Sequence, residues 1–228
     1  MSSSMEGRIV VVTGAAGRLG QRLVAAYAAA GATVAGVDQQ AAGIPVPAGA
    51  AVATYGADLT SEQGVTACFA EIADAHGRID VLIHTVGMWG MAPFHETSLE
   101  DWRMMMDVNL TSAFLCFRES VQHMRAHGGQ IIGMASAQGA DGGAGQQPGY
   151  SAAKAGVVRL VEALAEEYAD DEITAHAIAP SMLLYGAEEP GAAGVAAEHI
   201  VDLALYLSTP AHGQALNGSV IRAYGTMQ

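Results

Sequence analysis

Short apolar runs alternate with segments of helical spacing along this chain, and that alternation limits the possible folds more than any other feature. The runs at residues 9–13 and 79–85 have the length of strands and carry no alternating polar residues, as is typical of strands covered on both faces. Helical spacing follows the first run over residues 19–30, and strand–helix alternation with short loops indicates parallel βαβ units. We therefore predict an α/β fold with a doubly wound parallel sheet of about seven strands and helices on both faces. The expected strands are residues 9–13, 33–37, 51–55, 79–85, 130–134, 173–179 and 219–223.

The chain of 228 residues is expected to form a single domain over residues 7–228, after a flexible tail over residues 1–6. Hydrophobic residues make up 51% and charged residues 14%, which favours a large core over disorder. The net charge of −13 disfavours nucleic acid as a partner, because a phosphate backbone requires a basic face. The chain has no apolar stretch of the roughly 20 residues that span a bilayer and no signal-like N-terminus, so we expect a cytoplasmic protein without a membrane partner. The eight histidines form no HxH or HExxH cluster, and no metal site is predicted.

A glycine-rich turn follows the first expected strand. It reads TGAAGRLG over residues 13–20 and leads into a helical segment. Glycines permit close approach of a phosphate to the backbone, and a helix N-terminus supplies N–H donors and a positive partial charge. An ordinary tight turn is the alternative, but the position after the first strand favours a dinucleotide site.

Acidic residues follow the second and third expected strands. Asp38 comes 18 residues after Gly20, where a carboxylate accepts the hydroxyls of an adenine ribose and repels a 2′-phosphate. This favours NAD(H), whereas a guanidinium at Arg18 beside the phosphates leaves NADP(H) possible. Asp58 and Leu59 would lie near the adenine, with an ordinary capping or turn role for Asp58 as the alternative.

Tyr150 and Lys154 are four residues apart on an expected helix and therefore share a face. A free tyrosine titrates near pH ~10, and a neighbouring ammonium favours the phenolate, which improves proton exchange near neutrality. Such a pair also arises by chance on amphipathic helices, so by itself it does not establish a site.

Several motifs in order resemble the short-chain dehydrogenase/reductase family, which has a Rossmann fold, over residues 7–225. TGAAGRLG resembles the family's TGxxxGxG loop, and YSAAK resembles its YxxxK. Asn109 in DVNLTSAF matches the family's helix-four asparagine, and Ser136 in IIGMAS matches its catalytic serine. The resemblance predicts a Rossmann-type oxidoreductase that uses a nicotinamide cofactor.

The resemblance also implies a role for each catalytic residue. Tyr150 would exchange a proton with the substrate oxygen, and Ser136 would hydrogen-bond that oxygen. Lys154 would lower the pKa of the tyrosine and hold the nicotinamide ribose, and Asn109 would position a water that links Lys154 to solvent. The implied substrate residues are Ser136, Trp89 and Tyr150. The implied cofactor-binding residues are Gly14, Ala16, Arg18, Leu19, Gly20, Asp38, Asp58, Leu59, Gly87, Tyr150, Lys154, Pro180 and Leu183.

The chain departs from the family pattern at several positions. Arg18 replaces the middle glycine of the loop, as in the similar pteridine reductases, and HTVG over residues 84–87 replaces the usual Asn-Asn-Ala-Gly. His84, inside a strand, is interpreted as a structural histidine. Trp89 would stack on a flat substrate ring or else serve loop packing or a subunit contact. Tyr185 and Pro180-Ser181 replace a threonine and the usual Pro-Gly.

Three functions therefore remain open. The first is an enzyme acting on a small carbonyl or alcohol, and the second is a pterin reductase similar to dihydropteridine reductases. The third is a non-catalytic dinucleotide-binding regulator. In the family, the helices that correspond to residues 98–127 and 150–168 pack across a two-fold axis, so we expect a homodimer or homotetramer.

Overall fold

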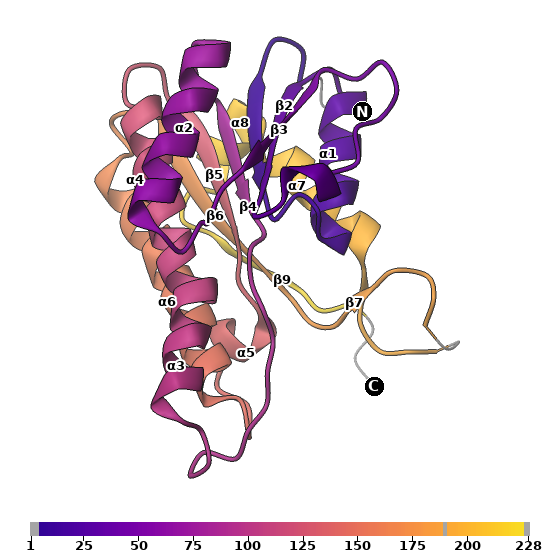
Figure 1. The fold of residues 1–228 in the computed structure, drawn as a ribbon, viewed down its shortest axis with the longest axis vertical. Coiled ribbons are helices and arrows are strands. Elements are labelled where there is room, and N and C mark those ends of the chain that lie inside the picture. Colours follow the sequence, from indigo (N-terminus) through magenta and orange to yellow (C-terminus); the bar gives the residue numbers. More distant parts are fainter. Residues whose placement is uncertain (1–4, 189–190, 226–228) are drawn as a thin grey trace.

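Seven strands form one parallel sheet in the computed structural model, which describes residues 5–188 and 191–225 (Figure 1). The strand order is β3-β2-β1-β4-β5-β6-β9, with every neighbouring pair parallel. This is the predicted doubly wound Rossmann-type sheet. Its strands are β1 (Ile9–Thr13), β2 (Thr33–Asp38), β3 (Val52–Gly56), β4 (Val81–His84), β5 (Gly129–Met134), β6 (Ile173–Pro180) and β9 (Val220–Ala223).

Helices cover both faces of the sheet. Helices α2 (Glu62–His76), α4 (Ser112–Met124) and α6 (Pro148–Glu167) lie on one face, and α1 (Arg18–Ala29), α7 (Ala197–Leu207) and α8 (Pro210–Ala215) lie on the other (Figure 1). The strand residues alternate between the two cores: Val11 packs under α2 and α4, whereas Val10 and Val12 pack under α1. Because both faces are covered, the strands are continuously apolar rather than alternating.

The direction of winding reverses beside β1. The chain leaves β1 through α1 to β2 and β3, then crosses to β4 on the other side of β1, where Thr13 pairs with His84. The loops that follow β1 and β4 therefore diverge and leave a crevice at the carboxyl ends of the strands. In open α/β sheets this is where ligands bind.

The long helix expected over residues 98–127 consists of three segments. These are α3 (Leu99–Met106), a π-helical turn over Asp107–Thr111 and α4. Such wide turns are frequent at functional sites, and Asn109 lies in this one. The glycine-rich segment over residues 136–149 contains a short helix, α5 (Ala137–Ala140). Two further short strands, β7 (Leu183–Leu184) and β8 (Val195–Ala196), and a 3₁₀ turn over Ala41–Gly43 complete the fold.

Met5, which the predicted tail over residues 1–6 included, packs into the core. Met5 is 1% exposed, belongs to the core under α1, and donates its backbone N–H to the carbonyl oxygen of Ala30 at 2.8 Å. An apolar side chain and a backbone bond to the end of α1 fix this residue, which sequence patterning placed outside the domain. Residues 1–4 of the predicted tail lie outside the described residues. Within the described ranges, no helix is both long enough and apolar enough to cross a membrane.

The position of Met5 gives a stability prediction. Replacing Met5 with Ala is expected to lower the free energy of unfolding by about 2–5 kcal/mol, because the change leaves a cavity in the core. Met91→Ala is the matched control, since Met91 is 50% exposed in the loop after β4, and should change it by less than about 0.5 kcal/mol. Urea denaturation measures both, and equal effects would show that Met5 is not part of the core.

Candidate active site

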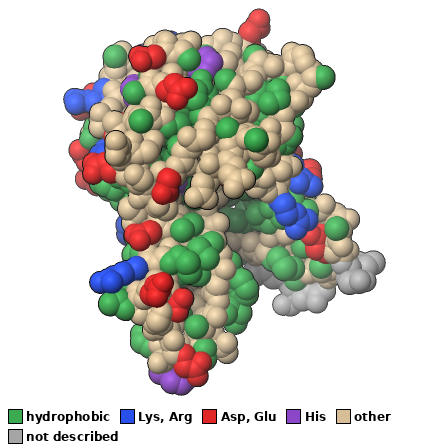
Figure 2. Space-filling view, viewed as in Figure 1, with side chains coloured by type: hydrophobic (Ala, Val, Ile, Leu, Met, Phe, Trp, Pro, Cys, Tyr) green, Lys and Arg blue, Asp and Glu red, His purple; other side chains and the backbone are tan. Residues whose placement is uncertain are grey.

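A cavity of about 1100 Å³ opens at the carboxyl ends of the strands, and the space-filling view shows a hollow in the molecular surface (Figure 2). Pockets for drug-sized ligands measure roughly 300–1,000 Å³, so this one has room for a dinucleotide with a small substrate. It collects nearly all the residues predicted from the sequence. They are Gly14, Arg18, Leu19, Gly20, Asp38, Asp58, Leu59, Gly87, Trp89, Asn109, Ser136, Tyr150, Lys154, Pro180 and Leu183.

Ala16 is the exception among the predicted residues, because it does not line the cavity. Its backbone N–H donates to Asp38 Oδ2 at 3.0 Å. Ala16 therefore positions the Asp38 carboxylate, which lines the cavity at the end of β2. Asp38 Oδ1 accepts a second bond from the N–H of Gln39 at 2.8 Å.

The turn between β1 and α1 needs its glycines for close backbone packing. Gly14 has φ of +69°, which favours glycine. A Cβ on Gly20 would collide with the carbonyl oxygen of Gly14 and come within 2.8 Å of Ala15 Cα. Gly17 caps α1 without a side chain, and the first helical turn has no acidic residue. The helix N-terminus therefore presents N–H donors and its positive partial charge to the cavity, which suits a pyrophosphate.

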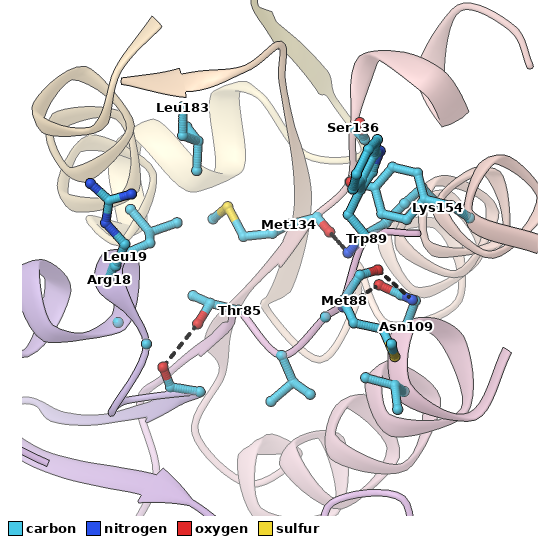
Figure 3. A pocket seen from close by; sticks show the side chains of 18 of the residues that line it. Arg18, Leu19, Thr85, Met88, Trp89, Asn109, Met134, Ser136, Lys154 and Leu183 are labelled. Atoms are coloured by element: carbon cyan, nitrogen blue, oxygen red, sulfur yellow. Dashed lines mark hydrogen bonds between the residues drawn. The ribbon is translucent and has the colours of Figure 1, made fainter. Parts of the chain in front are cut away.

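Arg18 lies at the same end of the cavity and is engaged by a neighbouring loop (Figure 3). Its guanidinium carbon is 3.8 Å from the centroid of the Tyr185 ring, and its Nη2 is 4.0 Å from Glu188 Oε1. Tyr185 occupies the position where the family was expected to have a threonine. In this chain the ring instead stacks on the first residue of α1.

Asp58 has the turn role that was offered as an alternative, and it also lies on the wall of the cavity. It lines the cavity after β3, and its Oδ1 accepts bonds from Thr60 Oγ1 at 2.7 Å and from the Thr60 N–H at 3.0 Å. These two bonds, the side-chain bond first, hold the pKa of Asp58 below its usual value. Asp58 is therefore both a turn residue and an ionised group at the edge of the cavity, with the buried Leu59 beside it.

Ser136, Tyr150 and Lys154 line the cavity together. Figure 3 shows Ser136 and Lys154 at the end across from Arg18 and Leu19. Ser136 ends the segment after β5, and the other two residues lie one turn apart on α6. Lys154 is the only lysine of the chain and is 5% exposed. Its Nζ donates to the carbonyl oxygen of Met134 at 2.8 Å and lies 6.0 Å from the centroid of the Tyr150 ring.

Burial dominates the ionisation of both groups on α6. Removal from water lowers the pKa of Lys154 to about 8 because it disfavours the ammonium. Burial raises the pKa of Tyr150, and a hydrogen bond with Ser136 acts in the opposite direction. The resemblance implied that Lys154 lowers the pKa of Tyr150, whereas in this structure the pKa of Tyr150 is raised by burial. The ammonium is held on the backbone of β5 rather than on the phenol oxygen.

Asn109 fixes the loop after β4. Its side-chain oxygen accepts the N–H of Met88 at 3.1 Å, and its Nδ2 donates to the carbonyl oxygens of Met88 and Met105, each at 3.0 Å. A Cβ on Gly87 would lie 2.8 Å from Asn109 Oδ1 and 3.1 Å from Lys154 Nζ. A side chain at position 87 would therefore have to displace the Asn109 amide or the Lys154 ammonium.

His84 has the structural role that was expected. It is 1% exposed and pairs through Nδ1 with Thr13 Oγ1 at 3.0 Å and through Nε2 with Ser112 Oγ at 3.3 Å. Burial, with a smaller effect of the charge on Lys154, lowers its pKa to about 3. His84 is therefore neutral at physiological pH, and it is not among the residues that line the cavity.

Two glutamines of the cavity were not predicted from the sequence. Gln138 accepts the Ser136 hydroxyl through Oε1 at 2.5 Å, and Gln147 accepts the indole N–H of Trp89 at 3.2 Å. Gln138 follows Ser136 by two residues, and Gln147 precedes Tyr150 by three. Their closeness in sequence to those residues was the available signal. In the described parts of the chain, no group of three or more His, Cys, Asp or Glu side chains could hold a metal ion.

The burial of Lys154 can be measured directly because the chain has no other lysine. Protein labelled with ¹³C at lysine Cε should show one titrating NMR signal with a midpoint near pH 8, against about 10.4 for a hydrated lysine. The amine is then cationic below about pH 8 and neutral above it. The same protein unfolded in urea is the control and should titrate at the normal value. A midpoint near 10.4 in the folded protein would contradict the burial.

Comparisons with known proteins agree with this geometry. The family model for the short chain dehydrogenase matches residues 8–189. D-threitol dehydrogenase from Mycolicibacterium smegmatis is 34% identical over 187 residues, which cover 79% of this chain and 72% of the relative. Cis-4-hydroxycyclohexanecarboxylate dehydrogenase from Sinomonas cyclohexanicum is 34% identical over 206 residues, which cover 87% of this chain and 80% of the relative.

Solved structures show the same fold. A short chain dehydrogenase from Mycobacterium smegmatis has a TM-score of 0.88 at 25% identity and covers 99% of this chain and 95% of its own. A short-chain type dehydrogenase/reductase from Mycobacterium marinum has a TM-score of 0.88 at 26% identity, and the match covers 97% of this chain and 95% of that structure. The family acts on CH–OH and C=O groups with nicotinamide cofactors. The chain is thus an oxidoreductase and belongs to the short-chain dehydrogenase/reductase family.

Proposed function

We propose that this enzyme transfers a hydride between NAD(H) and a small alcohol or carbonyl compound, with Tyr150 as the general acid and base. The observation that carries the proposal is the meeting of Ser136, Tyr150 and Lys154 at one end of a cavity whose other end is a glycine-rich helix N-terminus. A dinucleotide is long enough to join two such ends, and a hydroxyl, a phenol and an ammonium together can exchange a proton with a bound oxygen.

The cofactor fits the donor set of the cavity. Asp38 would accept the adenine ribose hydroxyls, with Asp58 and Leu59 beside the adenine. Gly14, Leu19 and Gly20 would surround the pyrophosphate. Lys154 has N–H donors for the nicotinamide ribose beyond the one given to Met134, and Gly87, Pro180 and Leu183 complete that end. The nicotinamide would supply or accept the hydride there.

The protein would control the proton of the reaction. In reduction, the Tyr150 hydroxyl donates its proton to the substrate oxygen, and the Ser136 hydroxyl donates a hydrogen bond to the same oxygen. A pKa of about 8 keeps Lys154 largely protonated at neutral pH, so its ammonium keeps all its N–H donors for Met134 and the nicotinamide ribose. In oxidation the phenolate accepts the proton. Asn109 holds the Met88 backbone and through it keeps Gly87 in place.

NAD(H) is preferred over NADP(H) in this proposal. The Asp38 carboxylate faces the glycine-rich turn and would repel a 2′-phosphate. Arg18, the residue that would favour NADP(H), is already engaged by Tyr185 and Glu188.

The exposed surface of the chain bears on its assembly. We propose one catalytic domain per chain and a homodimer or homotetramer. Large apolar side chains exposed on α3 and α4 support self-association. They include Leu99, Met104 and Phe114.

Removing the phenol oxygen tests the mechanism. Tyr150→Phe is expected to lower kcat by about 10²- to 10⁴-fold while NADH still binds, because only the proton-transferring group is lost. A panel of small alcohols with NAD⁺, followed by absorbance, measures turnover, and NADH fluorescence measures binding. Tyr168→Phe, at the far end of α6, is the control and should retain activity. Undiminished turnover in Tyr150→Phe would contradict the proposal.

Cofactor preference tests the role of Asp38. The wild type is expected to bind NADH at least about 10-fold more tightly than NADPH. Asp38→Ala should bring the two dissociation constants within about 3-fold, because the repulsion of the 2′-phosphate disappears. Asp58→Ala removes another carboxylate of the same cavity and should leave the ratio unchanged. Tighter binding of NADPH by the wild type would overturn the assignment.

A further inference from the structure

Gln138 occupies a position beside the Ser136 hydroxyl. The short helix α5 begins directly after Ser136, and this places the Gln138 side chain back over that residue. Ser136 Oγ donates to Gln138 Oε1 at 2.5 Å, and both residues line the cavity. Ser136 is 4% exposed, so its hydroxyl depends on protein or ligand partners rather than on bulk water.

A hydroxyl has one proton, and this creates a conflict with the proposed function. When Ser136 donates to Gln138, it has no proton left for the oxygen of the substrate. Turning the hydroxyl toward the substrate costs Gln138 Oε1 its protein donor, and this loss is unfavourable because the side chain is partly buried. A substrate that brings its own donor to Gln138 removes this cost.

We propose that Gln138 is a specificity-determining residue that selects substrates with a hydroxyl group on the carbon next to the reacting carbon. The substrate hydroxyl donates to Gln138 Oε1, and the Ser136 hydroxyl turns to donate to the reacting oxygen. One donor replaces another at Gln138, so every hydrogen bond is kept. Ser136 Oγ and Gln138 Oε1 are one hydrogen-bond length apart, which suits two oxygens on neighbouring carbons.

The charges of the cavity indicate that this substrate is neutral. Among the described residues that line it, the charged side chains are Arg18, Asp38, Asp58 and Lys154. Arg18 and Asp58 follow β1 and β3, and Asp38 ends β2. All three lie at the end assigned to the adenosine and the phosphates. Lys154 is held by Met134 and serves the ribose in the proposed function. The described lining around Ser136 thus offers no further cation to a carboxylate or phosphate.

Gln147, the other glutamine side chain that lines the cavity near Ser136, already has a hydrogen-bond partner. Gln147 Oε1 accepts the indole N–H of Trp89 at 3.2 Å, and the carbonyl oxygen of Gln146 accepts the N–H of Ala92 at 2.8 Å. These bonds join the loop after β4 to the start of α6. Gln147 therefore serves the wall of the cavity, whereas Gln138 faces the reacting group. The class of substrate that follows is a vicinal diol or the corresponding α-hydroxyketone.

A matched pair of alcohols tests this inference, which rests on the proposed function. The kcat/KM for 2,3-butanediol (a mixture of stereoisomers) and for 2-butanol is measured with NAD⁺ for the wild type, Gln138→Met and Gln147→Met. The wild type should prefer the diol by about 10- to 100-fold. Gln138→Met should lose about that factor on the diol and at most about 3-fold on 2-butanol. Gln147→Met should keep the wild-type ratio, and thermal unfolding checks that each variant is folded.

Binding provides a readout that does not depend on turnover. In Tyr150→Phe protein saturated with NAD⁺, calorimetry should show the dissociation constant of the diol rising about 10-fold or more when Gln138→Met is added. An equal loss on both alcohols would mean that Gln138 only orients Ser136, and this would overturn the inference, as would an unchanged diol affinity. Failure of the wild type to oxidise either alcohol would count against the proposed function, while the calorimetry still decides the role of Gln138.

Discussion

The ammonium of Lys154 lies in the interior of the protein, and the arrangement of the active site depends on how that charge is accommodated. A lysine away from water tends to lose its proton, and here the pKa falls to about 8. The bond from Nζ to the Met134 carbonyl oxygen compensates for part of the lost hydration. Because the end of β5 accepts this bond, it fixes the position of α6 against the sheet. The position of Tyr150, one helical turn before Lys154, is fixed with it.

The loop after β4 passes close to this ammonium. Gly87 passes between Lys154 and Asn109, where a Cβ would press on both side chains. Asn109 holds the next residue through both of its amide atoms. The π-helical turn places Asn109 at this loop while α3 and α4 continue on either side. Histidine at position 84 adds no second charge nearby, because burial keeps it neutral.

Much of the site could be predicted from local sequence because its residues follow strands. In a parallel sheet, all residues at the carboxyl ends of strands come to the same edge, so Gly14, Asp38, Asp58 and Ser136, each singled out by its own motif, line one cavity. Gln138 and Gln147 were missed because an amide in a glycine-rich segment has no periodic signal. The tail boundary was misplaced at Met5, since a single apolar residue after serines does not reveal that it packs under α1.

The sequence by itself determined the sheet, its two covered faces and the edge that holds the site, because apolar periodicity and glycine positions act locally along the chain. Only the tertiary structure decided which partners the polar groups take. Arg18 stacks on Tyr185 from a loop more than 160 residues away, and the Ser136 hydroxyl bonds to Gln138. The lysine bonds to a β5 carbonyl rather than acting on the phenol alone. Hydrogen bonds and ring contacts depend on distances of a few tenths of an ångström between elements, and these are fixed only when helices and sheet pack together.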